Sequence, residues 1–355
     1  MSKFAAMGKS SSRPVAVWIY TGVFLLLIQV VLGGITRLTG SGLSITEWDV
    51  ATGVVPPLNG AQWQVAFEKY QQTPQYRLVN SGFSLSDFKF IFFWEWFHRF
   101  WARMVLGGVF VVGFVWLLIK KQIRSDMVRP LIILFLLGAL QGLVGWIMVA
   151  SGLTGDAIYV APTKLAMHFI FALGLMVYTL WLGLQLSVPY EARVAAPGLR
   201  SWTVAILGVL FFQLIYGALM AGHKAANVAP TWPDVNGSFV PAGMFRGPWL
   251  EALAGDRIAV QFIHRTLAYL LFLLVIGWTL KAGRFRRLRW LPLSLIGVQI
   301  ALGISSLLTS PYIRPQQWVA FDWLAEFHQV TGLLFLLTMT GMLYLVMPHR
   351  RSVRV

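Results

Sequence analysis

The chain has 355 residues, of which 57% are hydrophobic and 12% are charged, and its mean hydropathy is +0.68. This composition is too apolar for a soluble globular protein and indicates a membrane protein. The sequence contains no cysteine, which excludes disulfides, thiolate metal sites, covalently attached c-type haem and iron–sulfur clusters. Any metal chemistry therefore needs histidine, methionine or carboxylate ligands.

Eight apolar runs, each of about 20 residues, are long enough to cross a bilayer as helices. In chain order they lie near Val15–Ile35, Trp96–Ile119, Pro130–Ala150, Leu165–Ser187, Leu199–Ala221, Ile258–Leu280, Trp290–Leu308 and Trp323–Met347. These runs are continuously apolar and lack the alternation that the wall of a β-barrel requires. We therefore expect an all-α polytopic membrane protein with eight transmembrane helices.

The formal net charge of +16 comes from an uneven distribution of basic residues. The N-terminus, the second, fourth and sixth connections with their edges, and the C-terminal tail hold 17 of the 29 Lys and Arg, but only two acidic residues. This asymmetry follows the positive-inside rule and places both termini in the cytoplasm. It indicates the inner membrane of a bacterial cell and lipid headgroups as partners of the basic clusters, and nucleic acid is not expected as a partner.

The first outer connection, residues 36–92, is long and contains two predicted short helices. One begins after Asn59. The other covers Phe88–Phe93, is capped by Ser84 or Ser86, and is expected to lie on the membrane surface. The second outer connection, residues 223–257, is the counterpart of the first. It holds a short helical stretch around Trp249–Leu253.

The two halves of the chain carry the same features in the same order, which indicates an internal duplication. The matching pairs are Gln29-x3-Gly33 with Gln213-x3-Gly217, Trp48, Gly53 and Pro57 with Trp232, Gly237 and Pro241, His98-Arg99 with His264-Arg265, Gln141-x3-Gly145 with Gln299-x3-Gly303, and His168 with His328. We expect two pseudo-symmetric four-helix bundles, related by an axis along the membrane normal. The expected divisions are a cytoplasmic tail (1–14), an N-terminal bundle (15–187), a linker (188–198), a C-terminal bundle (199–347) and a basic tail (348–355).

Four histidines recur just inside the start of every second apolar span: His98, His168, His264 and His328. They are expected within about two helical turns of the outer, periplasmic ends of these spans. Because the second and fourth helices of a bundle face the same interior, the two imidazoles of each half can converge. A haem needs one or two axial nitrogens, whereas a bare zinc or copper ion needs three or four protein ligands. The hypothesis is one axially ligated haem per half; the alternative is that each histidine is a hydrogen-bonded interfacial residue.

The two halves differ in the residue that lies three positions before the first histidine of each pair. It is Glu95 in the first half and Gln261 in the second. Three residues apart on a helix, Glu95 and His98 share a face, where a carboxylate could accept a proton or stabilise positive charge. The alternative is that Glu95 only forms an ion pair with Arg99, one helical turn further on.

Basic residues near the outer ends of the histidine-bearing spans are candidate partners of haem propionates, because arginine binds carboxylates bidentately. They are Arg99, Arg103 and Arg265, with Lys164 as a further candidate in the first half. The alternative, given equal weight for Arg103, is that these side chains reach out to lipid headgroups.

A group of motifs occurs in a specific combination: Gly33-Gly34-Ile35-Thr36-Arg37-Leu38-Thr39-Gly40-Ser41-Gly42-Leu43-Ser44, then Glu47-Trp48, Pro56-Pro57, Glu95-Trp96-Phe97-His98-Arg99 and His264-Arg265. In this combination the chain resembles the haem A synthase family, in its proteobacterial and mitochondrial branch, over nearly its whole length. The resemblance implies an enzyme that oxidises the C8 methyl group of haem O to a formyl group, giving haem A for terminal oxidases.

The same resemblance implies roles for the histidine pairs. The N-terminal half would hold the substrate haem O between His98 and His168, with Glu95 as the catalytic carboxylate. The C-terminal half would hold a haem b cofactor between His264 and His328, which relays electrons. Haem O synthase, an electron donor and a second copy of the chain are the implied partners. Other branches carry a cysteine pair in the first outer loop, and this chain has none.

Two alternatives from other classes remain open at the level of sequence. A di-haem b electron carrier would typically place its haems on both sides of the bilayer, whereas here all four candidate ligands lie on one side. A duplicated transporter would have helices broken at the middle of the membrane. The apolar runs of this chain are continuous.

Overall fold

A computed structural model describes residues 13–47, 53–245, 247–314 and 317–348. Most of the two predicted tails, and Trp48 of the duplicated pattern, lie outside these residues. The helices of the first half are α1 (Arg13–Leu38), α2 (Gly60–Gln71), α3 (Pro74–Val79), α4 (Leu85–Phe100), the π-helix η1 (Trp101–Leu106), α5 (Gly107–Ile119), α6 (Ser125–Ala150) and α7 (Pro162–Ser187).

The second half continues the helical pattern after a short turn. Its elements are η2 (Tyr190–Ala192), α8 (Pro197–Gly222), η3 (Ala225–Val228), α9 (Trp249–Gly255), α10 (Arg257–Lys281), η4 (Gly283–Arg289), α11 (Trp290–Thr309), η5 (Ser310–Tyr312) and α12 (Ala320–Leu345). Over the described residues, eight helical segments are long and apolar enough to cross a membrane. The predicted all-α fold with eight membrane helices is confirmed.

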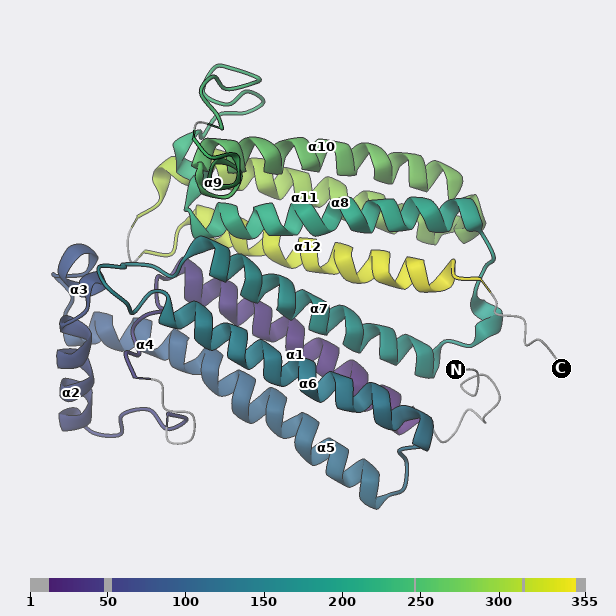
Figure 1. The fold of residues 1–355 in the computed structure, drawn as a ribbon, viewed down its shortest axis with the longest axis horizontal. Helices are drawn as coiled ribbons and strands as arrows, with labels where there is room; N and C mark the ends of the chain where they lie inside the picture. Colours follow the sequence, from purple (N-terminus) through teal and green to yellow (C-terminus); the bar gives the residue numbers. More distant parts are fainter. Residues whose placement is uncertain (1–12, 48–52, 246, 315–316, 349–355) are drawn as a thin grey trace.

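The long helices lie side by side in two groups (Figure 1). One group contains α1, α4 with α5, α6 and α7, and the other contains α8, α10, α11 and α12; contacts of α7 with α8 and of α1 with α12 join them. α1 begins and α12 ends at one end of the bundle, whereas α2, α3 and α9 lie at the opposite end (Figure 1). That opposite end is the one that the charge pattern predicts to face outward.

One predicted element of the first outer connection is wrong. The stretch Phe88–Phe93 is not a separate surface helix but part of α4, which begins at Leu85 and is continued by η1 and α5 to Ile119. Ser84 is the N-cap and forms a capping box with Asp87. Between this cap and the second apolar span there is no glycine or proline, so nothing ends the helix at the membrane surface. The predicted helix after Asn59 is confirmed as α2, which Asn59 caps.

Aromatic side chains fasten the outer turns of α4 to α2 and α3. Phe88 is fully buried and stacks on Phe67 and Tyr70, with both ring-centre distances at 5.2 Å. The Tyr70 hydroxyl donates to Gln75 Oε1 at 3.1 Å and accepts from Asn80 Nδ2 at 2.7 Å. Burial raises the pKa of Tyr70 to about 12, so this hydroxyl keeps its proton. α4 is therefore braced on the outer side before it enters the bundle.

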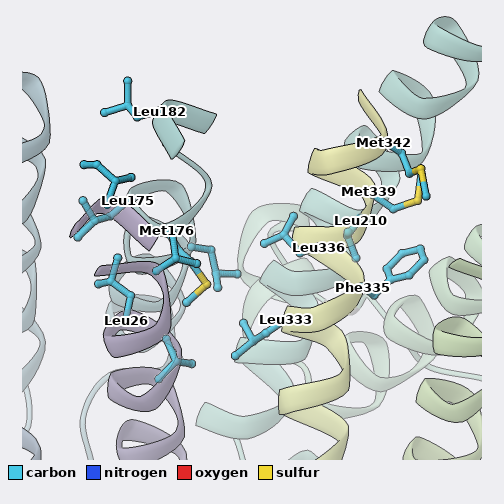
Figure 2. Close-up of a cluster of buried hydrophobic side chains, with 14 of the residues drawn as sticks. Leu26, Leu175, Met176, Leu182, Leu210, Leu333, Phe335, Leu336, Met339 and Met342 are labelled. Atoms are coloured by element: carbon cyan, nitrogen blue, oxygen red, sulfur yellow. The ribbon is translucent and has the colours of Figure 1, made fainter. Parts of the chain in front are cut away.

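A continuous apolar core joins the two groups of helices. Figure 2 shows side chains of α1 and α7, including Leu26 and Met176, near side chains of α12, including Leu333 and Leu336. Met176 and Leu333 are completely buried. Because lipid tails are as apolar as these side chains, close packing rather than the hydrophobic effect holds such helices together.

The backbones of the two halves come close together at the outer ends of α7 and α8. Gly222, the last residue of α8, lies so near Pro162 that an added Cβ would be 2.8 Å from the proline Cα. Real Cβ atoms do not come this close to backbone atoms, so only glycine fits without a shift of one helix against the other.

We expect Gly222→Ala to lower the free energy of unfolding by about 1–3 kcal/mol, because the added methyl group forces α7 and α8 apart. Gly208→Ala is the matched control, since a Cβ at this position on the same helix meets nothing within 4 Å. The control should be neutral or slightly stabilising. Thermal unfolding in one detergent would measure both variants, and equal midpoints for the two would contradict the packing argument.

Candidate functional site

The four histidines that were predicted to be haem ligands lie on the expected helices, α4, α7, α10 and α12. All four are partly buried. His168, His264 and His328 are about two turns from the outer starts of their helices, as expected. His98 is nearly four turns, about 20 Å, from the start of α4, because α4 extends outward beyond the bundle as a helix.

The histidines of the second half face each other directly. The ring centres of His264 and His328 are 6.3 Å apart, and the ring planes are inclined by 70°. His328 Nδ1 is 2.9 Å from the backbone oxygen of Gln299. Since a carbonyl oxygen can only accept, Nδ1 carries the proton and Nε2 keeps its lone pair. The Nδ1 atom of His264 is buried and has no hydrogen-bond partner among the described residues.

In the first half, each histidine is contacted by a glutamine of a neighbouring helix. Gln29 Nε2 on α1 donates to the backbone oxygen of His98 at 3.3 Å. Gln141 Nε2 on α6 donates to the backbone oxygen of His168 at 3.1 Å and lies 3.2 Å from His168 Nδ1. The structure therefore brings together the predicted pair of the second half, and it gives His98 and His168 of the first half equivalent glutamine contacts.

A glycine on a neighbouring helix makes room for each imidazole. An added Cβ would lie 3.4 Å from His98 Nε2 at Gly33, 2.8 Å from His168 Cε1 at Gly145, 3.3 Å from His264 Cε1 at Gly217, and 2.8 Å from His328 Cε1 at Gly303. The repeated Gln-x3-Gly motif is thus explained. The glycine has no side chain, so the imidazole can lie against its Cα. The glutamine one turn away forms a hydrogen bond to the same histidine-bearing helix. Sequence analysis noted this repeat but missed its link to the histidines.

The four glutamines of these motifs share one unusual property. The side-chain oxygens of Gln29, Gln141, Gln213 and Gln299 are all buried without a hydrogen-bond partner in the described part of the chain. Buried polar atoms are normally satisfied, so four equivalent unused acceptors indicate sites that are completed by water or by a bound group.

Glu95 is 2% exposed and holds the outer loop to α4. Its Oε2 atom accepts hydrogen bonds from the Ser44 hydroxyl at 2.7 Å and from the Ile45 backbone N–H at 2.8 Å. Its Oε1 atom forms a buried ion pair with Arg99. The ion pair considered from the sequence is therefore present, but it occupies only one of the two carboxylate oxygens.

Gln261, the counterpart of Glu95, also binds the outer loop of its own half. It donates hydrogen bonds to the loop, whereas Glu95 accepts them. Its amide nitrogen lies within 3.2–3.4 Å of the backbone oxygens of Ala225, Ala226 and Ala229. Arg265 adds two further bonds, from Nη1 to the Asp234 backbone oxygen and from Nη2 to that of Ala229. Two donor groups of Arg265 are thus used by the loop.

The remaining basic candidates lie on two helical segments of the first half. Arg103 is partly buried and lies on the π-helical segment η1. Such segments occur often at functional sites. Lys164 is exposed in the first turn of α7, one turn before His168, so the structure does not bring it into the buried group.

Two charged residues that were not among the predicted site residues lie between the halves. Glu326 on α12 is 6% exposed, lies two residues before His328, and neither carboxylate oxygen has a hydrogen-bond partner among the described residues. Arg37 on α1 donates to the backbone oxygen of Ala221 on α8. A charged residue within an apolar span was the available signal, because such residues are costly and usually functional.

Comparison with known protein families identifies the family of this chain. The model of the cytochrome oxidase assembly protein family matches residues 16–340, which include both pairs. The chain belongs to this family.

Among the relatives of this chain are several proteins named heme A synthase. The one from Flavobacterium psychrophilum is 38% identical over 346 residues, which cover 94% of this chain and 98% of the relative. That of Caulobacter sp. is 42% identical over 306 residues, covering 84% and 89%. That of Cereibacter sphaeroides (strain ATCC 17029) is 42% identical over 319 residues, covering 84% and 81%.

The outer loop that Arg265 holds should respond to pH through Asp234. Hydrogen bonds from the Gly237 N–H and the Thr231 hydroxyl hold the pKa of Asp234 below its usual value. The stabilisation is therefore present above the unfolded pKa of about 4 and is lost as pH falls through the lower folded value. Hydrogen-exchange protection of residues 231–237 should drop below about pH 4. Asp234→Asn should show low protection already at neutral pH, and an unchanged variant would contradict this.

Proposed function

We propose that this protein is a haem A synthase, which oxidises the C8 methyl group of haem O to a formyl group and so makes haem A for terminal oxidases. The observation that carries the proposal is membership of the cytochrome oxidase assembly protein family, together with relatives named heme A synthase that match most of the chain. The same comparisons favour this enzyme over a di-haem b electron carrier.

The C-terminal half is proposed to hold haem b between His264 and His328. The two ring centres are 6.3 Å apart, and imidazole is a common axial ligand of haem iron. The hydrogen bond that His328 Nδ1 donates to the Gln299 backbone oxygen also suits a ligand, because it fixes the ring and leaves the lone pair on Nε2, which lies 3.3 Å from Gln299 Nε2. When bound, the haem would supply a one-electron redox centre.

The N-terminal half is proposed to bind the substrate haem O between His98 and His168. Gly33 and Gly145 leave the space in which these imidazoles lie, and the duplicated glycines support the same arrangement in both halves. Arg99, Arg103, Arg265 and Lys164 remain the proposed partners of haem propionates. For Arg265 this role requires the N–H groups that the loop carbonyls leave unused, since a guanidinium has five.

Glu95 is proposed as the catalytic carboxylate. A methyl C–H bond is inert, so hydrogen or electrons must be removed before oxygen is added, and two hydroxylations followed by loss of water give the aldehyde. A methyl C–H bond that is broken by transfer of two electrons to an external oxidant also gives up a proton, and the carbon then takes its oxygen from water. Glu95, on the same helical face as His98, would accept a proton at a carboxylate oxygen or stabilise positive charge on the substrate. Gln261 cannot act as a base, which suits a half that only relays electrons.

The proposed setting follows from the charge pattern and the bundle. The protein would lie in the bacterial inner membrane with both termini cytoplasmic and both histidine pairs towards the periplasmic side. The start of α1 and the end of α12 at one end of the bundle support this orientation (Figure 1). Haem O synthase as the supplier of substrate, an electron donor and self-association are further proposals.

Haem extraction and chromatography test the proposal directly. Purified protein should yield haem b together with haem O or haem A, and haem b alone would favour the electron carrier. Glu95→Gln should reduce haem A formation at least about 100-fold, because it removes the proton acceptor, while haem b stays bound. Full activity of this variant would refute the catalytic role of Glu95.

The site of haem b is tested by a glycine pair on α11. Gly303→Ala places a methyl group 2.8 Å from His328 Cε1 and should displace the imidazole, so the variant should lose most of its haem b. The control is Gly297→Ala on the same helix, where a Cβ meets nothing within 4 Å. Haem b per protein and the low-spin optical spectrum are the measurements. Normal haem content in both variants would speak against His328 as a ligand.

A further inference from the structure

The Glu95 carboxylate is held mainly by the loop that follows α1. Oε2 accepts two hydrogen bonds, from the Ser44 hydroxyl and the Ile45 N–H, while Oε1 pairs with Arg99. Ser44 and Glu95 are each only 2% exposed. A carboxylate offers about four acceptor positions, so three donors fix its orientation and leave one position for a further partner or a proton.

The turn that carries Ser44 is itself fixed by short contacts. The Ser44 N–H donates to the Ser41 backbone oxygen at 3.1 Å, and the Ser41 N–H donates to the Thr36 backbone oxygen at 2.9 Å. Leu43 is 2% exposed and packs so closely against Gly152 that a Cβ there would lie 2.7 Å from its Cδ2. The hydroxyl of Ser44 is therefore presented to Glu95 by a rigid turn.

The outer helix α3 also contacts the residues just before this turn. Gln75 on α3 is 3% exposed, and its amide nitrogen lies 3.4 Å from the backbone oxygens of both Gly40 and Ile158. The aromatic cluster around Tyr70 holds α3 and α2 on α4. A chain of contacts thus leads from the outer helices through the turn to the carboxylate.

The second half shows that fastening the loop does not require a carboxylate. There, an amide at the position of Glu95 donates to three backbone oxygens of the loop. In the first half the loop instead offers a hydroxyl and an N–H. Both halves need to attach the outer loop to the histidine-bearing helix. The turn Ser41–Ile45 does more than this, because its donors are arranged to hold an anionic acceptor.

We propose that Ser44 is a positioning residue of the oxidation. Its hydroxyl, with the Ile45 N–H, keeps the Glu95 carboxylate in one orientation, so that its remaining acceptor position stays available for the proton that the substrate releases. Ser44 acts through Glu95 and does not itself touch the substrate. This inference rests on the proposed function and adds a residue of the first outer loop to the machinery.

The test compares three variants of the full-length protein loaded with haem O in lipid nanodiscs. Ser44→Ala should lower kcat for haem A formation about 10-fold, equivalent to ~1.4 kcal/mol, with KM for haem O and the content of both haems unchanged. Ser44→Thr keeps the hydroxyl and should restore most of the rate. Ser41→Ala is the matched control, because Ser41 is buried in the same turn but its hydroxyl bonds to Thr39 at 2.6 Å.

Each outcome decides the proposal. A rate of Ser44→Ala equal to wild type, or a loss that Thr does not rescue and that comes with lost haem O, would overturn the positioning role. Equal losses in Ser44→Ala and Ser41→Ala would do the same, since they would mean that the turn only needs its packing. If Ser44→Ala does not fold, Ser44→Cys keeps the shape with a weak donor and must show the same fall in kcat. Wild-type protein that makes no haem A would instead refute the proposed function itself.

Discussion

At each of the four histidines, a glycine on a neighbouring helix leaves space that an imidazole then fills. A methyl group at Gly145 or Gly303 would lie 2.8 Å from a ring carbon, which no native packing tolerates. The glutamine one turn earlier forms a hydrogen bond to the same histidine-bearing helix and so fixes the position of that helix along the bundle axis. Because lipid offers no hydrophobic drive for helix association, these close contacts decide where the rings lie. Both candidate haem sites depend on them.

On this common framework a single position makes the halves different. Glu95 and Gln261 lie three residues before the first histidine of each pair, and each side chain binds the outer loop of its own half. The loops have adapted to the side chain, with donors facing the carboxylate and carbonyls facing the amide. An exchange of the two residues would set a carboxylate against three carbonyl oxygens. The chemical difference between the halves is therefore built into the loops as well as into the helices.

The apolar runs predicted the eight membrane helices. The cap residues Asn59 and Ser84 predicted the starts of α2 and α4, because helix starts are set by local hydrogen bonds. The continuity of α4 was missed, since the aromatic packing that keeps its outer turns helical is tertiary. The histidine pairs could be predicted from the duplication. The partners of Glu95 and Arg265 could not, because they are backbone groups of loops whose course the sequence leaves open. Glu326 was overlooked although its charge lies within an apolar span.

The contact between α1 and α12 ties the two sites to each other. Gly33 faces His98, whereas the next residue, Gly34, faces Glu326 and Gln329 of the other half. Gln329, the neighbour of His328, donates to the backbone oxygen of Val30 at 3.0 Å. Two adjacent glycines of α1 thus face the proposed substrate site on one side and α12, which carries the proposed haem b ligand His328, on the other. The proposed electron transfer between two haem groups would depend on their spacing, which the direct packing of α1 on α12 would keep constant.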